Sequence, residues 1–227
     1  ESCFSCHTVG FDKDAANGGI DDAADYADFL DAGLINNPGD NWTTVLSDFP
    51  ATAKLGNIQC ENCHGPNVGG AHTTGEVRMT LSSDMCGQCH GEPLRHGRYQ
   101  QWQLSRHSNY ELAIEEGESG SCSRCHTANG FLAWLPILVD ETKTEEERLA
   151  DVTVTWTAEQ IHPQTCVTCH DPHDPGSVSG DNPDTTVRIT GDTPPLIAGF
   201  TATDVGSGAI CMTCHQGTTS MVQLDEA

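Results

Sequence analysis

The segment CVTCH at residues 166–170 decides how this chain folds, because its pattern, C-x-x-C-H, occurs six times. The six segments are CFSCH (3–7), CENCH (60–64), CGQCH (86–90), CSRCH (122–126), CVTCH (166–170) and CMTCH (211–215). They use all 12 cysteines: Cys3, Cys6, Cys60, Cys63, Cys86, Cys89, Cys122, Cys125, Cys166, Cys169, Cys211 and Cys214. The histidines that follow are His7, His64, His90, His126, His170 and His215. Repetition without a stray cysteine indicates one chemical purpose for every pair.

The histidine after each cysteine pair separates the kinds of site that this pattern could form. Zinc ribbons, disulfide frameworks and thioredoxin-like redox pairs all use paired cysteines, but none of them needs a histidine after every pair. A c-type haem does, because two thiols two residues apart can reach both vinyl groups on one porphyrin edge, and the next histidine then lies under the iron. We therefore expect six haem c groups, each with two cysteines and a proximal histidine.

The composition indicates that porphyrin, more than side chains, fills the interior. Hydrophobic residues make up 36% of the chain and aromatic residues 6%, which is little material for an ordinary apolar core. Sharing 227 residues among six haems leaves about 38 residues for each, so the haems must contact one another or lie close together. We predict a fold of mostly irregular loops with a few α-helices and very little β structure. We expect one haem-cored hexahaem domain over residues 1–227.

Residues 97–117 have the pattern of a helix that begins after Pro93 and ends at Gly117. His107 lies in the middle of this predicted helix. Its face, with the spacing of one helical side, contains Tyr99, Gln103, His107, Tyr110 and Ile114. We expect this face to lie against a haem.

Four other stretches carry weaker patterns. Residues 20–32 predict an amphipathic helix that Gly33 ends, and residues 152–156 and 187–190 predict short strands. The apolar segment FLAWLPILV at 131–139 favours burial against a haem edge, with a subunit interface as the alternative.

Five histidines remain as candidate second axial ligands of the irons: His72, His96, His107, His162 and His173. Imidazole is a good ligand of haem iron, so histidines beside exposed irons are expected to bind them. His162 follows a predicted capped turn and precedes Pro163. His173 lies in a proline-stiffened loop that can present it only to a haem other than that of its own motif.

One iron lacks a candidate, since five histidines face six irons. We favour a histidine upstream of Glu1, in a segment missing from the front of the chain. The alternatives are the terminal amine, a methionine, or an open iron. The candidate methionines are Met79, Met85 and Met221.

Charge and hydropathy restrict the location and partners. The formal net charge is −23, which disfavours nucleic acid and anionic membrane surfaces as partners. The longest apolar run, 131–139, is far shorter than the roughly 20 residues of a membrane span, so we expect none. Covalent haem attachment in prokaryotes takes place outside the cytoplasmic membrane. We therefore expect a secreted, periplasmic or extracellular protein whose signal peptide has been removed.

With these motifs in place, the chain resembles the multihaem cytochrome superfamily of tetrahaem carriers, octahaem hydroxylamine-oxidoreductase-type enzymes and extracellular cytochrome filaments, or nanowires. The resemblance covers most of the chain. It rests on CHTVGFD (6–12), NIQCENCHGP (57–66), QWQLSRHS (101–108), CVTCHDPH (166–173) and VGSGAICMTCH (205–215). It implies that His72, His107 and His173 are distal haem ligands.

The expected function is electron transfer and not enzymatic catalysis. We expect a subunit of an extracellular conductive filament, whose partners are other copies of itself and redox proteins or extracellular acceptors. The alternatives are a soluble periplasmic or extracellular electron shuttle, and an oxyanion reductase with one open haem. No C-x-x-C-K motif of the nitrite reductase kind occurs in the sequence, which counts against the enzyme.

Overall fold

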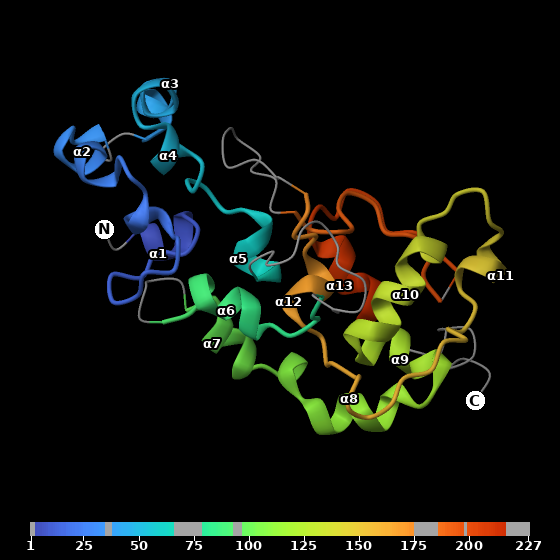
Figure 1. Cartoon of the computed structure of the whole chain (residues 1–227). Coiled ribbons are helices and arrows are strands. Elements are labelled where there is room, and N and C mark those ends of the chain that lie inside the picture. Colours follow the sequence, from blue (N-terminus) through green and yellow to red (C-terminus); the bar gives the residue numbers. More distant parts are fainter. Residues whose placement is uncertain are drawn as a thin grey trace, which may run out of the picture. The chain divides into compact units, whose positions relative to one another are not determined.

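The computed structural model describes residues 3–34, 38–65, 79–92, 97–174, 186–197 and 199–216. In these ranges the chain forms short helices joined by irregular loops (Figure 1). The β structure of the described ranges consists of two single bridges, Thr8 with Gly56 and His170 with Val187. The predicted fold class is therefore confirmed.

The helices are short, and six of them carry the C-x-x-C-H segments. The α-helices are α1 (Phe4–His7), α2 (Tyr26–Asp31), α3 (Pro38–Asp48), α4 (Pro50–Ala53), α5 (Cys60–His64), α6 (Asp84–His90), α7 (Arg98–Gln103), α8 (Tyr110–Gly117), α9 (Gly120–His126), α10 (Ala128–Leu138), α11 (Glu145–Arg148), α12 (Cys166–Cys169) and α13 (Gly208–Cys214). The 3-10 turns include η1 (Ile20–Asp22) and η3 (Arg106–Ser108). The motifs lie on α1, α5, α6, α9, α12 and α13, and a helical turn brings residues three apart to the same side. Among the described helices, none is long and apolar enough to cross a membrane.

The chain divides into two compact units, and each contains three of the six motifs. Unit 1 comprises Glu1–Thr80 and Met85–His96, and unit 2 comprises Leu81–Asp84 and Gly97–Ala227. The first three motifs thus belong to unit 1 and the last three to unit 2. This division does not test the single hexahaem domain expected over residues 1–227, which stays a prediction.

Aromatic rings form the core of unit 1. Its buried hydrophobic residues are Phe4, Ile20, Tyr26, Phe29, Val45 and Ala53. Phe4 lies inside the first motif, and its ring packs edge-on against that of Tyr26, with the centroids 6.0 Å apart. The carboxylate of Asp25 accepts hydrogen bonds from the amides of Ala51 at 2.9 Å and Thr52 at 2.7 Å, which caps the start of α4. The first motif is therefore anchored in this core.

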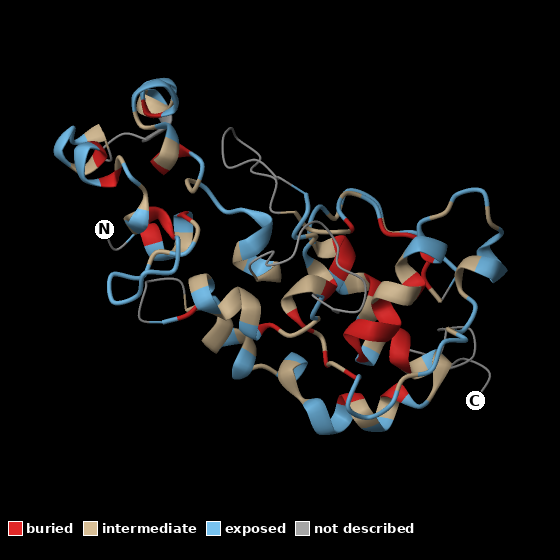
Figure 2. Cartoon of the chain, viewed as in Figure 1, coloured by how far each residue is buried: buried red, intermediate tan, exposed pale blue. Residues whose placement is uncertain are grey.

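Helix α10 supplies the core of unit 2, where Phe131, Trp134 and Leu138 are almost fully buried (Figure 2). The indole of Trp134 donates a hydrogen bond of 2.8 Å to the carbonyl oxygen of Arg148. Ile137 and Val139 of the same segment are exposed, and the burial against a haem edge predicted for 131–139 stays a prediction. Gly130 lets α10 approach α9 closely, because a Cβ atom at this position would lie 2.3 Å from the carbonyl oxygen of Ser123.

The single helix predicted over 97–117 is wrong, since this stretch forms α7, η3 and α8. Local hydrogen bonds interrupt it. The hydroxyl of Ser105 accepts from the amide of His107 at 3.2 Å, and the side chain of Asn109 caps the start of α8. Serine and asparagine side chains that bind nearby backbone compete with helical hydrogen bonds. The predicted end at Gly117 is confirmed.

Two further predictions need correction. The helix predicted over 20–32 is split into η1 and α2, while Gly33 beyond it has the left-handed φ of +65° that ends helices. Residues 152–156 form no strand, and segment 187–190 contributes only the bridge at Val187. An alternating segment is not stable as a strand without an extended paired neighbour. Segment 152–156 has no paired strand in the described ranges, and segment 187–190 has only the single bridge to His170.

Candidate haem-binding sites

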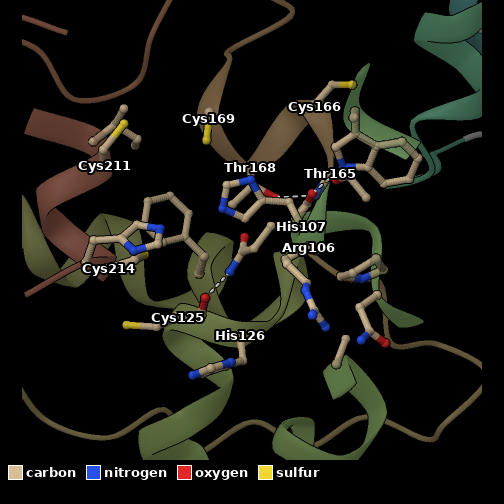
Figure 3. Close-up of a pocket in the computed structure, with 18 of the residues that line it drawn as sticks. Arg106, His107, Cys125, His126, Thr165, Cys166, Thr168, Cys169, Cys211 and Cys214 are labelled. Carbon is tan, nitrogen blue, oxygen red and sulfur yellow. Dashed lines mark hydrogen bonds between the residues drawn. The ribbon is translucent and has the colours of Figure 1, made fainter. Parts of the chain in front are cut away.

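Unit 2 contains a cavity of about 520 Å³ onto which the last three motifs open (Figure 3). This volume lies in the range of roughly 300–1,000 Å³ usual for ligand and cofactor pockets. Its lining includes Cys125 and His126 of the fourth motif, Cys166, Cys169 and His170 of the fifth, and Cys211, Cys214 and His215 of the sixth. Apolar side chains such as Trp102, Phe131 and Ile210 form other parts of the wall. Thiols, imidazoles and apolar walls together fit covalently attached porphyrin.

The thiols of different motifs come into contact at this cavity. The thiols of Cys125 and Cys214 are neighbours, and the interaction between them together with burial raises the pKa of Cys214. Burial also raises the pKa of Cys169, and the charges that Cys211 and Cys166 would carry add to that effect. The fourth, fifth and sixth motifs therefore meet at their cysteines.

Four histidines line the cavity: His107, His126, His170 and His215. The ring centroids of His107 and His215 are 6.0 Å apart, and the ring planes make an angle of 69°. His107 lies in η3 and not in the single helix that was predicted over 97–117, and His215 directly follows α13. The structure thus brings one candidate distal ligand to three proximal histidines.

Two consecutive hydrogen bonds support one side of the cavity. The indole of Trp102 donates a 2.6 Å hydrogen bond to the carbonyl oxygen of Gln164, whose side-chain amide donates to the carbonyl oxygen of Cys125. At the start of α12, the hydroxyl of Thr168 accepts a hydrogen bond of 3.0 Å from the amide of Thr165. The sequence analysis missed these residues, although the T-x-x-T spacing directly before and inside the fifth motif is a helix-capping signal.

His162 and His173 lie elsewhere in unit 2. Nδ1 of His162 is 3.4 Å from the Tyr110 hydroxyl, and burial lowers the pKa of this histidine. The turn predicted before it is present, since the amide of Gln160 donates to the carbonyl oxygen of Thr157 at 2.9 Å. The side chain of His173 is 80% exposed. The candidates His72, His96 and Met221 lie outside the described residues, and the site roles of all these residues stay predictions.

Unit 1 has a cavity of about 680 Å³ beside the first motif. Cys3 and His7 line it, together with Thr8, Thr52 and Asn57 and the apolar residues Phe4, Ile20, Phe29, Leu34, Trp42, Val45 and Ala53. Broad apolar walls beside one cysteine and one histidine fit a planar porphyrin.

The three motifs of unit 1 also come together. The thiol of Cys89 lies 4.0 Å from the carbonyl oxygen of Cys6. Burial, together with the neighbouring Cys6 and Cys63, raises the pKa of Cys89 to about 11. Asn62 in the second motif donates a 2.8 Å hydrogen bond to the carbonyl oxygen of Thr8, which follows the first. Both units therefore gather three C-x-x-C-H segments.

The cysteines form no disulfide and belong to no clustered metal site in the described ranges. All 12 lie in the described ranges, and none forms a disulfide. In the part of the chain that the structure describes, no group of three or more His, Cys, Asp or Glu side chains is arranged to hold one metal ion.

Comparison with known proteins identifies one related family. A family model described as cytochrome c7 and related cytochrome c matches residues 47–127. This segment contains the second, third and fourth motifs. No curated protein and no solved structure matches the chain. The match supports a multihaem c-type cytochrome and haem-mediated electron transfer.

Proposed function

We propose that this chain transfers electrons through six c-type haems, each bound covalently to the two cysteines of one C-x-x-C-H segment. The observation that carries the proposal is the convergence of three such segments on one cavity in unit 2, with thiols of different motifs in contact. A bound haem supplies an iron that exchanges single electrons, and its ligands and surroundings set the reduction potential. The family match at residues 47–127 supports the same chemistry.

The residues of the chain have three roles in this function. Cysteines fix each porphyrin edge, and the six proximal histidines bind the irons. Capped motif helices such as α5 and α12 hold the cysteine pairs in place. Apolar side chains such as Phe131, which is almost fully buried, form part of the cavity wall against which porphyrin would pack. We also propose His72, His96, His107, His162 and His173 as distal ligands.

Intact mass and absorption after denaturation test the haem count. A chain with thioether-bound haem keeps its colour when unfolded, and we expect a mass increase of six haem groups. The variant Cys211→Ser/Cys214→Ser is expected to carry five haems. A colourless chain, or a count that the removal of one motif does not lower, would overturn the proposal.

We further propose that the protein works in the periplasm or outside the cell as a subunit of a conductive filament. Six haems in 227 residues and the resemblance to filament cytochromes support this role. The net charge of −23 opposes contact between like subunits, so assembly should need salt or bound cations. Negative-stain microscopy of the native protein at several salt concentrations tests it. Single particles of subunit size under all these conditions would favour a soluble shuttle.

A further inference from the structure

We propose that His107 and His215 are the two axial ligands of one haem, the haem attached to Cys211 and Cys214, and that this haem lies between those of the fourth and fifth motifs. The proposal rests on the haem binding proposed above and assigns one ligand pair within it.

The distance between the two rings fits a shared iron. A bond between a metal and an imidazole nitrogen is about 2 Å long, so two imidazoles on opposite sides of one metal ion have centroids about 6 Å apart. The rings of His107 and His215 are 6.0 Å apart and both line the 520 Å³ cavity. Their angle of 69° is compatible with ligation, because each ring can rotate about its own bond to the iron.

Both rings are available as ligands, and both backbones are held in place. Within the described ranges, the ring nitrogens of His107 and His215 have no hydrogen-bond partner. The amide of His107 is bonded to the Ser105 hydroxyl at 3.2 Å, and that of His215 to the carbonyl oxygen of Cys211 at 2.8 Å. Imidazoles that face an apolar cavity without polar partners are suited to bind a metal ion.

The cysteine contacts put the sixth haem in the middle. A thioether marks a vinyl edge of its porphyrin, so thiols in contact mean neighbouring porphyrin edges. Cys214 lies next to Cys125 of the fourth motif and near Cys169 of the fifth, and all three line the same cavity. Cys169 in turn lies near Cys211. Electrons that pass between the fourth and fifth haems would therefore cross the sixth, an order that differs from the order in the sequence.

Substitution of His107 provides the first test, read by electron paramagnetic resonance and redox titration. In His107→Ala we expect one sixth of the iron to become high-spin while six haems remain bound. In His107→Met we expect no further iron to become high-spin and one potential to rise, because a methionine ligand raises the potential of haem. Leu104→Ala, three positions before His107 with a side chain that is 89% exposed and outside the cavity lining, is the control and should match the original chain in both measurements.

The second test identifies which haem His107 serves. In the chain with Cys211→Ser/Cys214→Ser, which should carry five haems, the further change His107→Ala should produce no new high-spin iron. If one of the five becomes high-spin, His107 binds another haem and the pairing is wrong. If His107→Ala adds no high-spin iron to that of the original chain and leaves the potentials unchanged, His107 is not a ligand. Both results differ from a haem-free chain, which would instead refute the proposed function.

Discussion

Replacement of Gly130 by alanine should damage the contact between α9 and α10, and its effect can be worked out from the structure. Gly130 is the third residue of α10. A Cβ atom there would lie 2.3 Å from the carbonyl oxygen and 2.4 Å from the carbonyl carbon of Ser123, and 2.8 Å from the amide nitrogen of Arg124. All three are backbone atoms of the helix that carries the fourth motif. Because carbon contacts are normally about 3.5–4 Å, the two helices must separate by about 1 Å.

Two opposing contributions set the change in the free energy of unfolding. Overpacking a well-packed interior costs about 1–3 kcal/mol, and a clash with backbone belongs at the upper end of that range. Alanine is more favourable than glycine inside a helix by about 1 kcal/mol, which offsets part of the cost. We therefore expect Gly130→Ala to lower the free energy of unfolding by about 2 kcal/mol.

Gly208→Ala is the matched control, because Gly208 begins α13 and a Cβ atom there would have no neighbour within 4 Å. This variant should be as stable as the original chain or slightly more stable. Denaturant unfolding of the haem-loaded protein, followed by circular dichroism, gives both free energies. Equal stability of the two variants would refute the claim that α9 and α10 are in backbone contact at Gly130.

Three other variants test hydrogen bonds that stabilise the two units. Asp25→Asn should cost about 1 kcal/mol through the weakened cap of α4. Although burial alone would raise the pKa of Asp25, its hydrogen bonds to Thr52 and the α4 backbone lower it overall, so its stabilisation is complete above the ordinary carboxyl pKa. It is lost as the pH falls through the lowered value, so unfolding measured between pH 7 and pH 2 should show the deficit of the variant shrinking. Trp134→Phe should lower the free energy of unfolding by about 1–3 kcal/mol, because the carbonyl oxygen of Arg148 loses its donor; a thermal midpoint equal to that of the original chain would contradict this. Asn62→Ala removes the bond between the first two motifs and a cap of α5, so a loss of about 1–2 kcal/mol is expected in denaturant titrations, and an unchanged titration midpoint would show that neither bond contributes.

Patterns within a few residues of the sequence predicted several features of the structure. The fold class followed from the repeated motif and the thin apolar composition. The end of α8 at Gly117 and the burial of the apolar run around Trp134 also follow from residues close together in the chain. Each of these features depends on the backbone conformation or the apolar side chains of residues that are close together in the sequence.

The breaks and the contacts between distant segments could not be predicted in this way. Helical periodicity continues through residues 97–117, but Ser105 and Asn109 give the backbone alternative hydrogen bonds that periodicity does not register. The meeting of Cys125 with Cys214 joins residues far apart in the sequence, and no spacing rule relates them. Sequence spacing also does not show which histidines are neighbours, because the ring that lies beside His107 is His215 of the last motif.

The partial burial of three cysteines in unit 2 also bears on the maturation of the chain. Cys125, Cys169 and Cys214 are each partly buried around the cavity of unit 2. An enzyme that joins a cofactor to these thiols must reach them while the polypeptide is still open. Under the proposed function, ligation therefore precedes collapse, and each newly attached porphyrin adds the apolar surface around which the next segment condenses.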